Sequence, residues 1–359
     1  MGRKFTILLG TAAIAVAGCA AAQSTTVRTP EGAEMNVSAD LAYKPGELTQ
    51  AQLASSTRDL FSQDSMNVFR RFPREKTAEM VQFYTEALAL RSLSPIQLTS
   101  TQQMILTGVG SGQIKLSAGT QGNRKFDLEG GYRGGTGIRF FMLSYPDPAV
   151  VRQRFRDAGF AEPEFVERGD GYRQALVRDP GGFDIVILTR PGLKDHSDDG
   201  VGIGIAVSDL ARSRAFYREF VGLDELDPVP ATVLGTTLYP YRHKETRVFL
   251  YEAMGEGIDN GSAGIQYVVR DTPMVDAKAR HRGGIAVETP LNKLAGFDLV
   301  TVWLNDPDGV TNYFAQVGPG SRTAQQAREG GLPAPFCCRH SPPARACWAV
   351  RLPGPTCAK

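Results

Sequence analysis

The sequence predicts an α+β protein in which four βαβββ units form two tandem domains. Two pairs of matching segments are the main reason. FYTEALAL at residue 83 matches FYREFVGL at residue 216, and RDPGGFDIVIL at residue 178 matches NDPDGVTNYFA at residue 305. The offsets, 133 and 127 residues, are nearly equal, and the order of the segments is the same in both halves. A repeated order at nearly one spacing predicts duplicated domains.

The second half shows the βαβββ pattern most clearly. VGIGIAVSDL alternates with a period of two, which predicts a strand, and Ser208 or Asp209 can cap the helix expected in LARSRAFYREFVGL. Gly222 ends that helix, and TVLGTTLYPY and TRVFLYEAM, separated by RHKE, predict a hairpin. The pattern restarts at SAGIQYVVRD and ends at VTNYFAQVG, so this half holds two units.

The first half divides in the same way, with MNVFRRFPR and GTGIRFFMLSY as the opening strands of its two units. The two domains are therefore expected at residues 66–190 and 201–318. The turn-rich, charged residues 191–200 between them are expected to be a linker.

Composition is consistent with two globular domains and argues against one class of partner. The chain has 359 residues, of which 42% are hydrophobic, enough to bury a core in each domain. Its net charge of +2 gives no overall basic field, so nucleic-acid binding is not expected.

The N-terminus predicts export. Residues 1–22 have Arg3 and Lys4, then an apolar run and small residues, which is the pattern of a secretory signal peptide. The run ends in a Val-Ala-Gly-Cys sequence that resembles the bacterial lipobox, so we expect lipidation of Cys19 and anchoring on the periplasmic side of a bacterial membrane. The alternative is cleavage near Ala22, which would leave a soluble periplasmic protein.

Two further segments lie outside the predicted domains. Residues 23–65 are polar and are expected to be a tether, with one short helix candidate. Residues 319–359 carry four of the five cysteines among prolines, without the CxxC pairs of a zinc site, and are expected to be disordered.

The ordered motifs resemble the vicinal oxygen chelate superfamily, which includes glyoxalases, bleomycin-resistance proteins and extradiol dioxygenases. The resemblance rests on a strand, the SDL turn, the helix with FYREFVGL and the terminal DPDG, in this order. It implies that paired βαβββ units curl into two glyoxalase-like domains, each an open eight-stranded cup with helices outside and a ligand pocket inside. In enzymatic members it also implies a divalent metal held by His and Glu side chains.

The resemblance places the metal ligands at positions that carry unsuitable residues here. The first-strand position is Gly202 and the last-strand position is Tyr313, and the repeat offsets transfer these to Phe69 and Val186 in the first half. None of the four is an imidazole or a carboxylate, the donors that such sites use. We therefore expect no metal and no other cofactor.

Other polar and aromatic residues on predicted cup strands are candidates for ligand binding. Tyr313, Tyr251 and Tyr267 could stack on a ring, as could Trp303. Gln266 and Glu252 could supply polar contacts, and Glu252 is also the carboxylate best placed to act as a displaced metal ligand. The competing interpretation for Gln266, Glu252 and Tyr267 is that they pack in the ordinary way or lie at the rim of the cup.

The sequence thus favours a metal-free module that binds an apolar or aromatic small molecule. The alternative is a metal-dependent enzyme of the same superfamily, an isomerase, lyase or ring-cleavage dioxygenase with displaced ligands. A third possibility is an interaction protein that uses the cup edges to form a homodimer.

Overall fold

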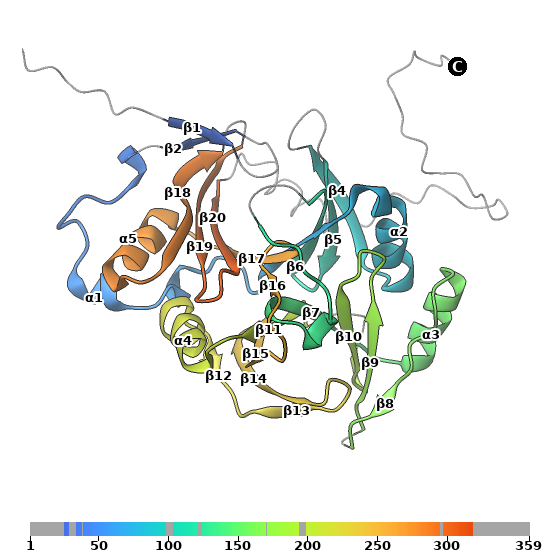
Figure 1. Ribbon diagram of the computed structural model, residues 1–359. Helices are drawn as coiled ribbons and strands as arrows, with labels where there is room; N and C mark the ends of the chain where they lie inside the picture. Colours follow the sequence, from blue (N-terminus) through green and yellow to red (C-terminus); the bar gives the residue numbers. More distant parts are fainter. Residues whose placement is uncertain are drawn as a thin grey trace, which may run out of the picture.

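The described part of the chain forms two mixed β-sheets and five α-helices (Figure 1). The computed structural model describes residues 25–28, 34–37, 39–97, 103–120, 124–169, 171–193, 199–294 and 297–318. The predicted signal peptide with Cys19 and the C-terminal segment 319–359 lie outside these residues. None of the helices in the described part of the chain has the length and apolarity needed to cross a membrane.

The first sheet has ten strands. In spatial order they are β1 (Thr25–Arg28), β2 (Glu34–Val37), β18 (Ala286–Leu294), β19 (Leu299–Asn305), β20 (Thr311–Val317), β17 (Ala263–Val268), β3 (Asn67–Phe72), β6 (Gly112–Ala118), β5 (Gln103–Val109) and β4 (Arg91–Gln97).

The second sheet also has ten strands, eight of them in one continuous order. These are β12 (Asp224–Glu225), β14 (Thr236–His243), β15 (Thr246–Glu252), β11 (Gly202–Val207), β7 (Thr136–Tyr145), β10 (Asp184–Thr189), β9 (Arg173–Arg178) and β8 (Val166–Glu167). The short strands β13 (Val229–Ala231) and β16 (Ile258–Asp259) pair with β14 and β7.

Four of the five helices follow the opening strands, as the sequence predicts, and α1 lies before the first of these strands. The five helices are α1 (Gln50–Ala54), α2 (Thr77–Gln82), α3 (Pro148–Asp157), α4 (Leu210–Arg214) and α5 (Thr272–Arg282). α2 and α4 continue as π-helical turns that contain the repeated Phe-Tyr pair. Of the two predicted caps for α4, Asp209 accepts the helix N–H groups, whereas the Ser208 hydroxyl donates to Asp308.

Four βαβββ units are therefore confirmed, and the third contains one additional short strand, β13. Unit 1 runs from β3 to β6, unit 2 from β7 to β10, unit 3 from β11 to β15 and unit 4 from β17 to β20. The predicted hairpin in unit 3 is present as β14 and β15.

The pairing of the units differs from the one that the duplication suggested. β3 of unit 1 pairs with β17 of unit 4, and β7 of unit 2 pairs with β11 of unit 3. We call the sheet of units 1 and 4 cup 1 and the sheet of units 2 and 3 cup 2. Each cup takes one unit from each half of the chain, so residues 66–190 and 201–318 delimit sequence repeats and not sheets. The opening strands share the same apolar alternation, so the sequence fits either pairing.

One hydrophobic core lies between the two sheets and the helices. Successive side chains alternate across each strand. On β3, Val68 and Phe72 belong to this helix-side core, whereas Phe69 points to the opposite face. We call that opposite face the inner face of the cup. Residues on the inner faces form two smaller clusters, one in each cup.

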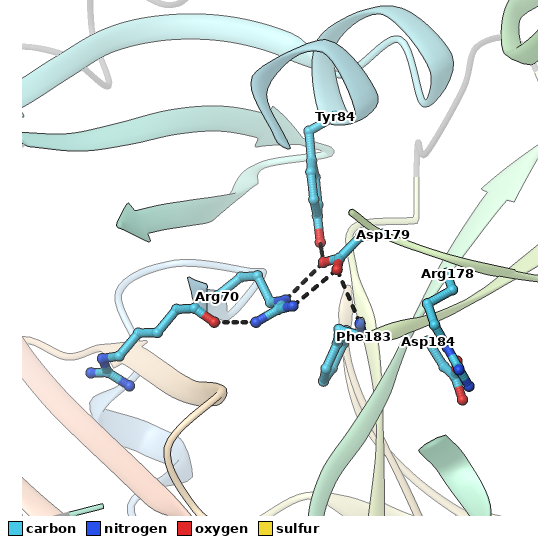
Figure 2. A network of polar contacts seen from close by, with 7 residues as sticks. Arg70, Tyr84, Arg178, Asp179, Phe183 and Asp184 are labelled. Carbon is cyan, nitrogen blue, oxygen red and sulfur yellow. Dashed lines mark hydrogen bonds and ion pairs between the residues drawn. The ribbon is translucent and has the colours of Figure 1, made fainter. Parts of the chain in front are cut away.

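Two buried tyrosine–aspartate pairs join the units within each half and explain the repeated motifs. Tyr84 of the FYTEALAL segment donates to Asp179 of the DPGG turn, with 3.1 Å between the oxygens (Figure 2). Tyr217 of FYREFVGL donates to Asp306 of the DPDG turn at 2.9 Å. Each aspartate also accepts backbone N–H groups of its own turn. The two segments recur together because their side chains bind each other.

The two aspartates differ in their charge environment. Arg70 donates to both carboxylate oxygens of Asp179, at 2.8 and 2.9 Å, and this ion pair is buried (Figure 2). Asp306 forms no such ion pair among the described residues, and burial raises its pKa to about 7.

Candidate functional site

The inner face of cup 1 carries a continuous row of aromatic side chains. Phe69 on β3 and Tyr313 on β20 have ring centroids 5.8 Å apart, and Tyr313 is 5.0 Å from Trp303 on β19. Trp303 and Tyr313 are direct cross-strand partners. These three side chains are 6–7% exposed, whereas most of the helix-side core is at 0 or 1%. The row is therefore packed less completely than the core on the other side of the same sheet.

A buried lysine lies at one end of this aromatic row. Lys115 on β6 is the direct cross-strand partner of Phe69, and its Nζ is 5.5 Å from the centroid of that ring. The ammonium donates to Oε1 of Gln266 at 2.6 Å, and the residue is 4% exposed. Burial lowers the pKa of Lys115 to about 8, and no carboxylate in the described part of the chain forms an ion pair with it. Buried lysines with a shifted pKa are concentrated at functional sites.

Polar groups without partners lie on the same face. Gln266 also accepts a hydrogen bond from Asn67, at 3.0 Å, so its oxygen is fully used. In contrast, Oε1 of Gln113 and Nε1 of Trp303 are buried with no hydrogen-bond partner among the described residues. A buried polar atom without a partner costs about 1–3 kcal/mol, which a bound polar ligand could recover. Strand alternation on β6 puts Gln113 on the same face as Lys115.

A second basic side chain also lies near the Phe69 ring. The guanidinium carbon of Arg71 is 5.5 Å from the ring centroid, and Nη1 donates to the carbonyl of Gly261 at 3.2 Å. The Phe69 ring thus lies close to both Arg71 and Lys115.

The inner face of cup 2 is filled by its own side chains. Phe140 and Tyr251 stack with centroids 5.8 Å apart, and both are 0% exposed. A Cβ placed on Gly204 would lie 2.1 Å from the Phe140 ring, so the ring packs directly on the glycine backbone. The segment from β13 to β14 adds three more buried side chains to this cluster, Ala231, Leu234 and Leu238.

The residues of cup 1 do not fit a divalent metal. The structure does bring Phe69 and Tyr313 together, as the resemblance implies for the ligand positions, but their neighbours across the strands are Lys115 and Gln266. A positive ammonium in this row repels a second cation. Within the described ranges, no three His, Cys, Asp or Glu residues come together in a way that could hold a metal ion.

The equivalent positions in cup 2 are no more suitable. Val186 is buried in the inner cluster, and a Cβ on Gly202 would lie 2.9 Å from Phe249. Neither residue has a donor atom in its side chain.

The sequence candidates for ligand binding are distributed over four places. Tyr313 and Gln266 are neighbours on the inner face of cup 1, in register on β20 and β17. Tyr251 lies in cup 2, where its hydroxyl donates to the carbonyl of Tyr132 at 2.8 Å and burial raises its pKa.

The other two candidates lie away from both inner faces. Tyr267 belongs to the helix-side core and stacks on Phe61, with centroids 5.5 Å apart. Glu252 is exposed at the end of β15. The structure therefore brings together only Tyr313 and Gln266 of the candidate set, with Trp303.

Lys115 is the residue that the sequence reasoning missed. In QIKLSAG it alternates with Ile114 and Leu116, and a lysine in such a pattern is normally on the solvent side of a strand. In a cup both faces of the strand are buried, so the polar side chains of the alternation line the interior. Once the cup was expected, this rule could have identified Lys115.

Comparisons with known proteins agree with this geometry. Residues 201–314 match the sequence model of the Glyoxalase/Bleomycin resistance protein/Dioxygenase superfamily. Glyoxalase I from Zea mays is 19% identical with a TM-score of 0.57, over 71% of this chain and 92% of that chain. A candidate dioxygenase from Bacillus subtilis is 15% identical with a TM-score of 0.51, over 76% of this chain and 97% of that chain. No curated protein matches the sequence significantly. At these identities the structural likeness shows a common fold.

Proposed function

We propose that this chain, in which residues 201–314 match the sequence model of the glyoxalase/bleomycin resistance protein/dioxygenase superfamily, is an exported protein that binds a small molecule in cup 1 without a metal. The observation that carries this proposal is the incompletely packed aromatic row of Phe69, Tyr313 and Trp303. Ligand sites are typically lined by aromatic side chains with a few polar groups that fix orientation. Export is supported by the N-terminal sequence alone.

The unpaired polar atoms of the same face support a ligand in preference to a purely structural role. Most buried polar groups in folded proteins have a partner, and an unpaired one requires an explanation. Gln113 and Trp303 each present one such atom on the inner face of cup 1. A ligand with polar groups would recover part of this cost, and its apolar part would cover the rings.

Trp303 provides a direct optical test. The chain has two tryptophans, so Trp348→Phe in the full chain leaves Trp303 as the only one. We expect aromatic compounds that raise the Tm of this variant also to quench its fluorescence. A compound that stabilises the protein strongly without changing Trp303 fluorescence would place the site outside cup 1.

Tyr313→Ala tests the row itself. We expect at least a tenfold loss of affinity for a compound found in this way, because the substitution removes the central ring of the row, while the protein stays folded. Phe249→Leu, on the inner face of cup 2, is the matched control and should leave affinity unchanged. Unchanged affinity in Tyr313→Ala, measured by fluorescence titration, would remove this residue from the site.

Elemental analysis tests the metal-free part of the proposal. The full chain should be compared with a variant in which Cys337, Cys338, Cys347 and Cys357 are serine, because these tail thiols can bind metal by themselves. After incubation with Mn, Fe, Ni or Zn and dialysis, we expect no stoichiometric metal in the serine variant. One retained equivalent in that variant would instead support a metal-dependent enzyme.

A further inference from the structure

Lys115 lies beside the positions of cup 1 at which the resemblance implies the ligands of a metal cation. Its cross-strand partner is Phe69, and Gln266, to which it donates, is in register with Tyr313. The cation present in this chain is therefore covalently attached and carries a single charge. It can do one thing that a metal site also does, which is to attract an oxyanion.

The surroundings of Lys115 lack the negative charge that would neutralise it. Its one hydrogen-bond acceptor in the described part of the chain is the neutral amide oxygen of Gln266. An ammonium has three N–H donors, and a buried charge is costly unless it is paired. An anionic ligand would supply both the missing charge and the missing acceptor.

The aromatic row sets the shape of the rest of the ligand. Neighbouring groups along the row are 5.5 Å apart from the Lys115 ammonium to the Phe69 ring, 5.8 Å from Phe69 to Tyr313, and 5.0 Å from Tyr313 to Trp303. At the far end, Arg124 lies over Trp303 at 5.4 Å and pairs with Glu288, so that end is neutralised by the protein itself. The site thus has one positive group, Lys115, without a carboxylate partner among the described residues, and a row of tilted aromatic rings that extends from it.

We propose that cup 1 binds an aromatic carboxylate, with the carboxylate on Lys115 and the aromatic part against the row of Phe69, Tyr313 and Trp303. This inference rests on the proposed function and specifies its ligand class. Cationic aromatic compounds are disfavoured because Lys115 repels them. Neutral aromatic compounds lack the charge that pairs with the ammonium.

Three matched probes test the charge requirement: 2-naphthoate, 2-naphthamide and 2-naphthylmethylamine. They share one ring system and differ in charge, so differences in affinity report on the polar end. Binding is measured by quenching of Trp303 in the full-length Trp348→Phe protein and by thermal shift. We expect naphthoate to bind at least tenfold tighter than the amide, and the amine to bind most weakly.

Lys115→Met assigns the preference to this residue. Methionine keeps the length and removes the charge, so we expect this variant to bind naphthoate and naphthamide equally. Lys115→Arg keeps the charge and should retain most of the preference for naphthoate over naphthamide. This variant still tests the role of the charge if the methionine variant fails to fold. Lys244→Met, on the exposed turn after β14, is the matched control and should behave as the parent protein.

The outcomes separate this inference from the proposed function. Equal binding of all three probes in the parent protein, or an undiminished preference in Lys115→Met, would overturn the carboxylate assignment and leave a binding module for neutral ring compounds. Absence of binding by every probe up to its solubility limit would contradict the proposed function together with this inference.

Discussion

The two cups are built from equivalent strands but have different interiors. At the seam where two units meet, each cup pairs a glycine with a phenylalanine: Gly264 with Phe69 in cup 1, and Gly204 with Phe140 in cup 2. In cup 2 the phenylalanine ring lies on the glycine, within 2.1 Å of where a Cβ would be, whereas in cup 1 the nearest ring atom is 3.6 Å away.

This difference indicates how one fold can hold one site and one structural domain. Cup 2 closes by packing its own aromatic and aliphatic side chains into the interior. In cup 1 the Phe69 ring contacts Lys115 and Tyr313, and the interior keeps polar atoms without partners.

The largest expected effect is on the pH dependence of stability, and it comes from the aspartate of the DPDG turn. Asp306, in the turn before β20 of cup 1, has a pKa raised from 3.8 to about 7, whereas its counterpart Asp179 is paired with Arg70. Because the folded-state pKa is the higher one, the stability from this group is present below about pH 4 and is lost as the pH rises through 7. The loss is up to about 4 kcal/mol.

Asp306→Asn isolates this effect. The amide keeps an acceptor for the backbone N–H groups of the turn but does not titrate. Urea unfolding between pH 4 and pH 8 should show falling stability in the parent protein and a nearly flat profile in the variant. An identical slope in both proteins would mean that Asp306 is not the group responsible.

Alanine at the two seam glycines tests whether cup 2 is filled and cup 1 has room. Gly204→Ala should destabilise the protein by about 3 kcal/mol, because the fully buried Phe140 ring cannot move away from the new Cβ. Gly264→Ala should change stability by less than about 1 kcal/mol, since its nearest neighbour is at 3.5 Å. Equal losses in the two variants, by chemical denaturation, would remove the contrast between the cups.

Lys115→Met should stabilise the protein at neutral pH, by up to about 3 kcal/mol. The folded-state pKa of Lys115 is about 8, below its ordinary value of 10.5, so the buried charge opposes folding below pH 8. That penalty disappears as the pH rises from 8 to 10.5, and stability in the parent protein should rise over this window. The variant should lack this rise in stability with pH. A variant that is less stable than the parent protein at neutral pH would instead show that Lys115 supports the fold.

A smaller effect is expected for the polar group of cup 2. Tyr251→Phe removes a buried hydrogen bond to the carbonyl of Tyr132 and should cost about 1 kcal/mol of stability. Because Tyr251 lies in cup 2, this substitution should not change the affinity of the protein for a compound that binds in cup 1. A changed affinity would connect cup 2 to binding.

The sequence was sufficient to predict the four units but not to predict which units share a sheet. The repeated Phe-Tyr and Asp-Pro segments predicted four βαβββ units correctly, since Tyr84 with Asp179 and Tyr217 with Asp306 hold equivalent places together. The pairing of unit 1 with unit 4 could not be predicted, because every opening strand offers the same apolar edge and the choice depends on the whole assembly.

The site was predictable in part for a similar reason. Tyr313 and Gln266 were both candidates from the sequence, and the structure brings them together on the inner face of cup 1. Tyr267 was also a candidate, but it is buried in the helix-side core, which the strand pattern alone does not indicate. Lys115 was missed because its position looks exposed unless both faces of its strand are known to be covered.

Methyl NMR tests the contrast between the cups most directly. Met104 lies on the inner face of cup 1 and Met142 on that of cup 2, so labelled methionine methyl groups report on each interior in the same sample. On titration with an aromatic carboxylate that binds the protein, the Met104 signal should shift and the Met142 signal should stay in place. A shift of Met142 without a shift of Met104 would contradict the assignment of the ligand site to cup 1.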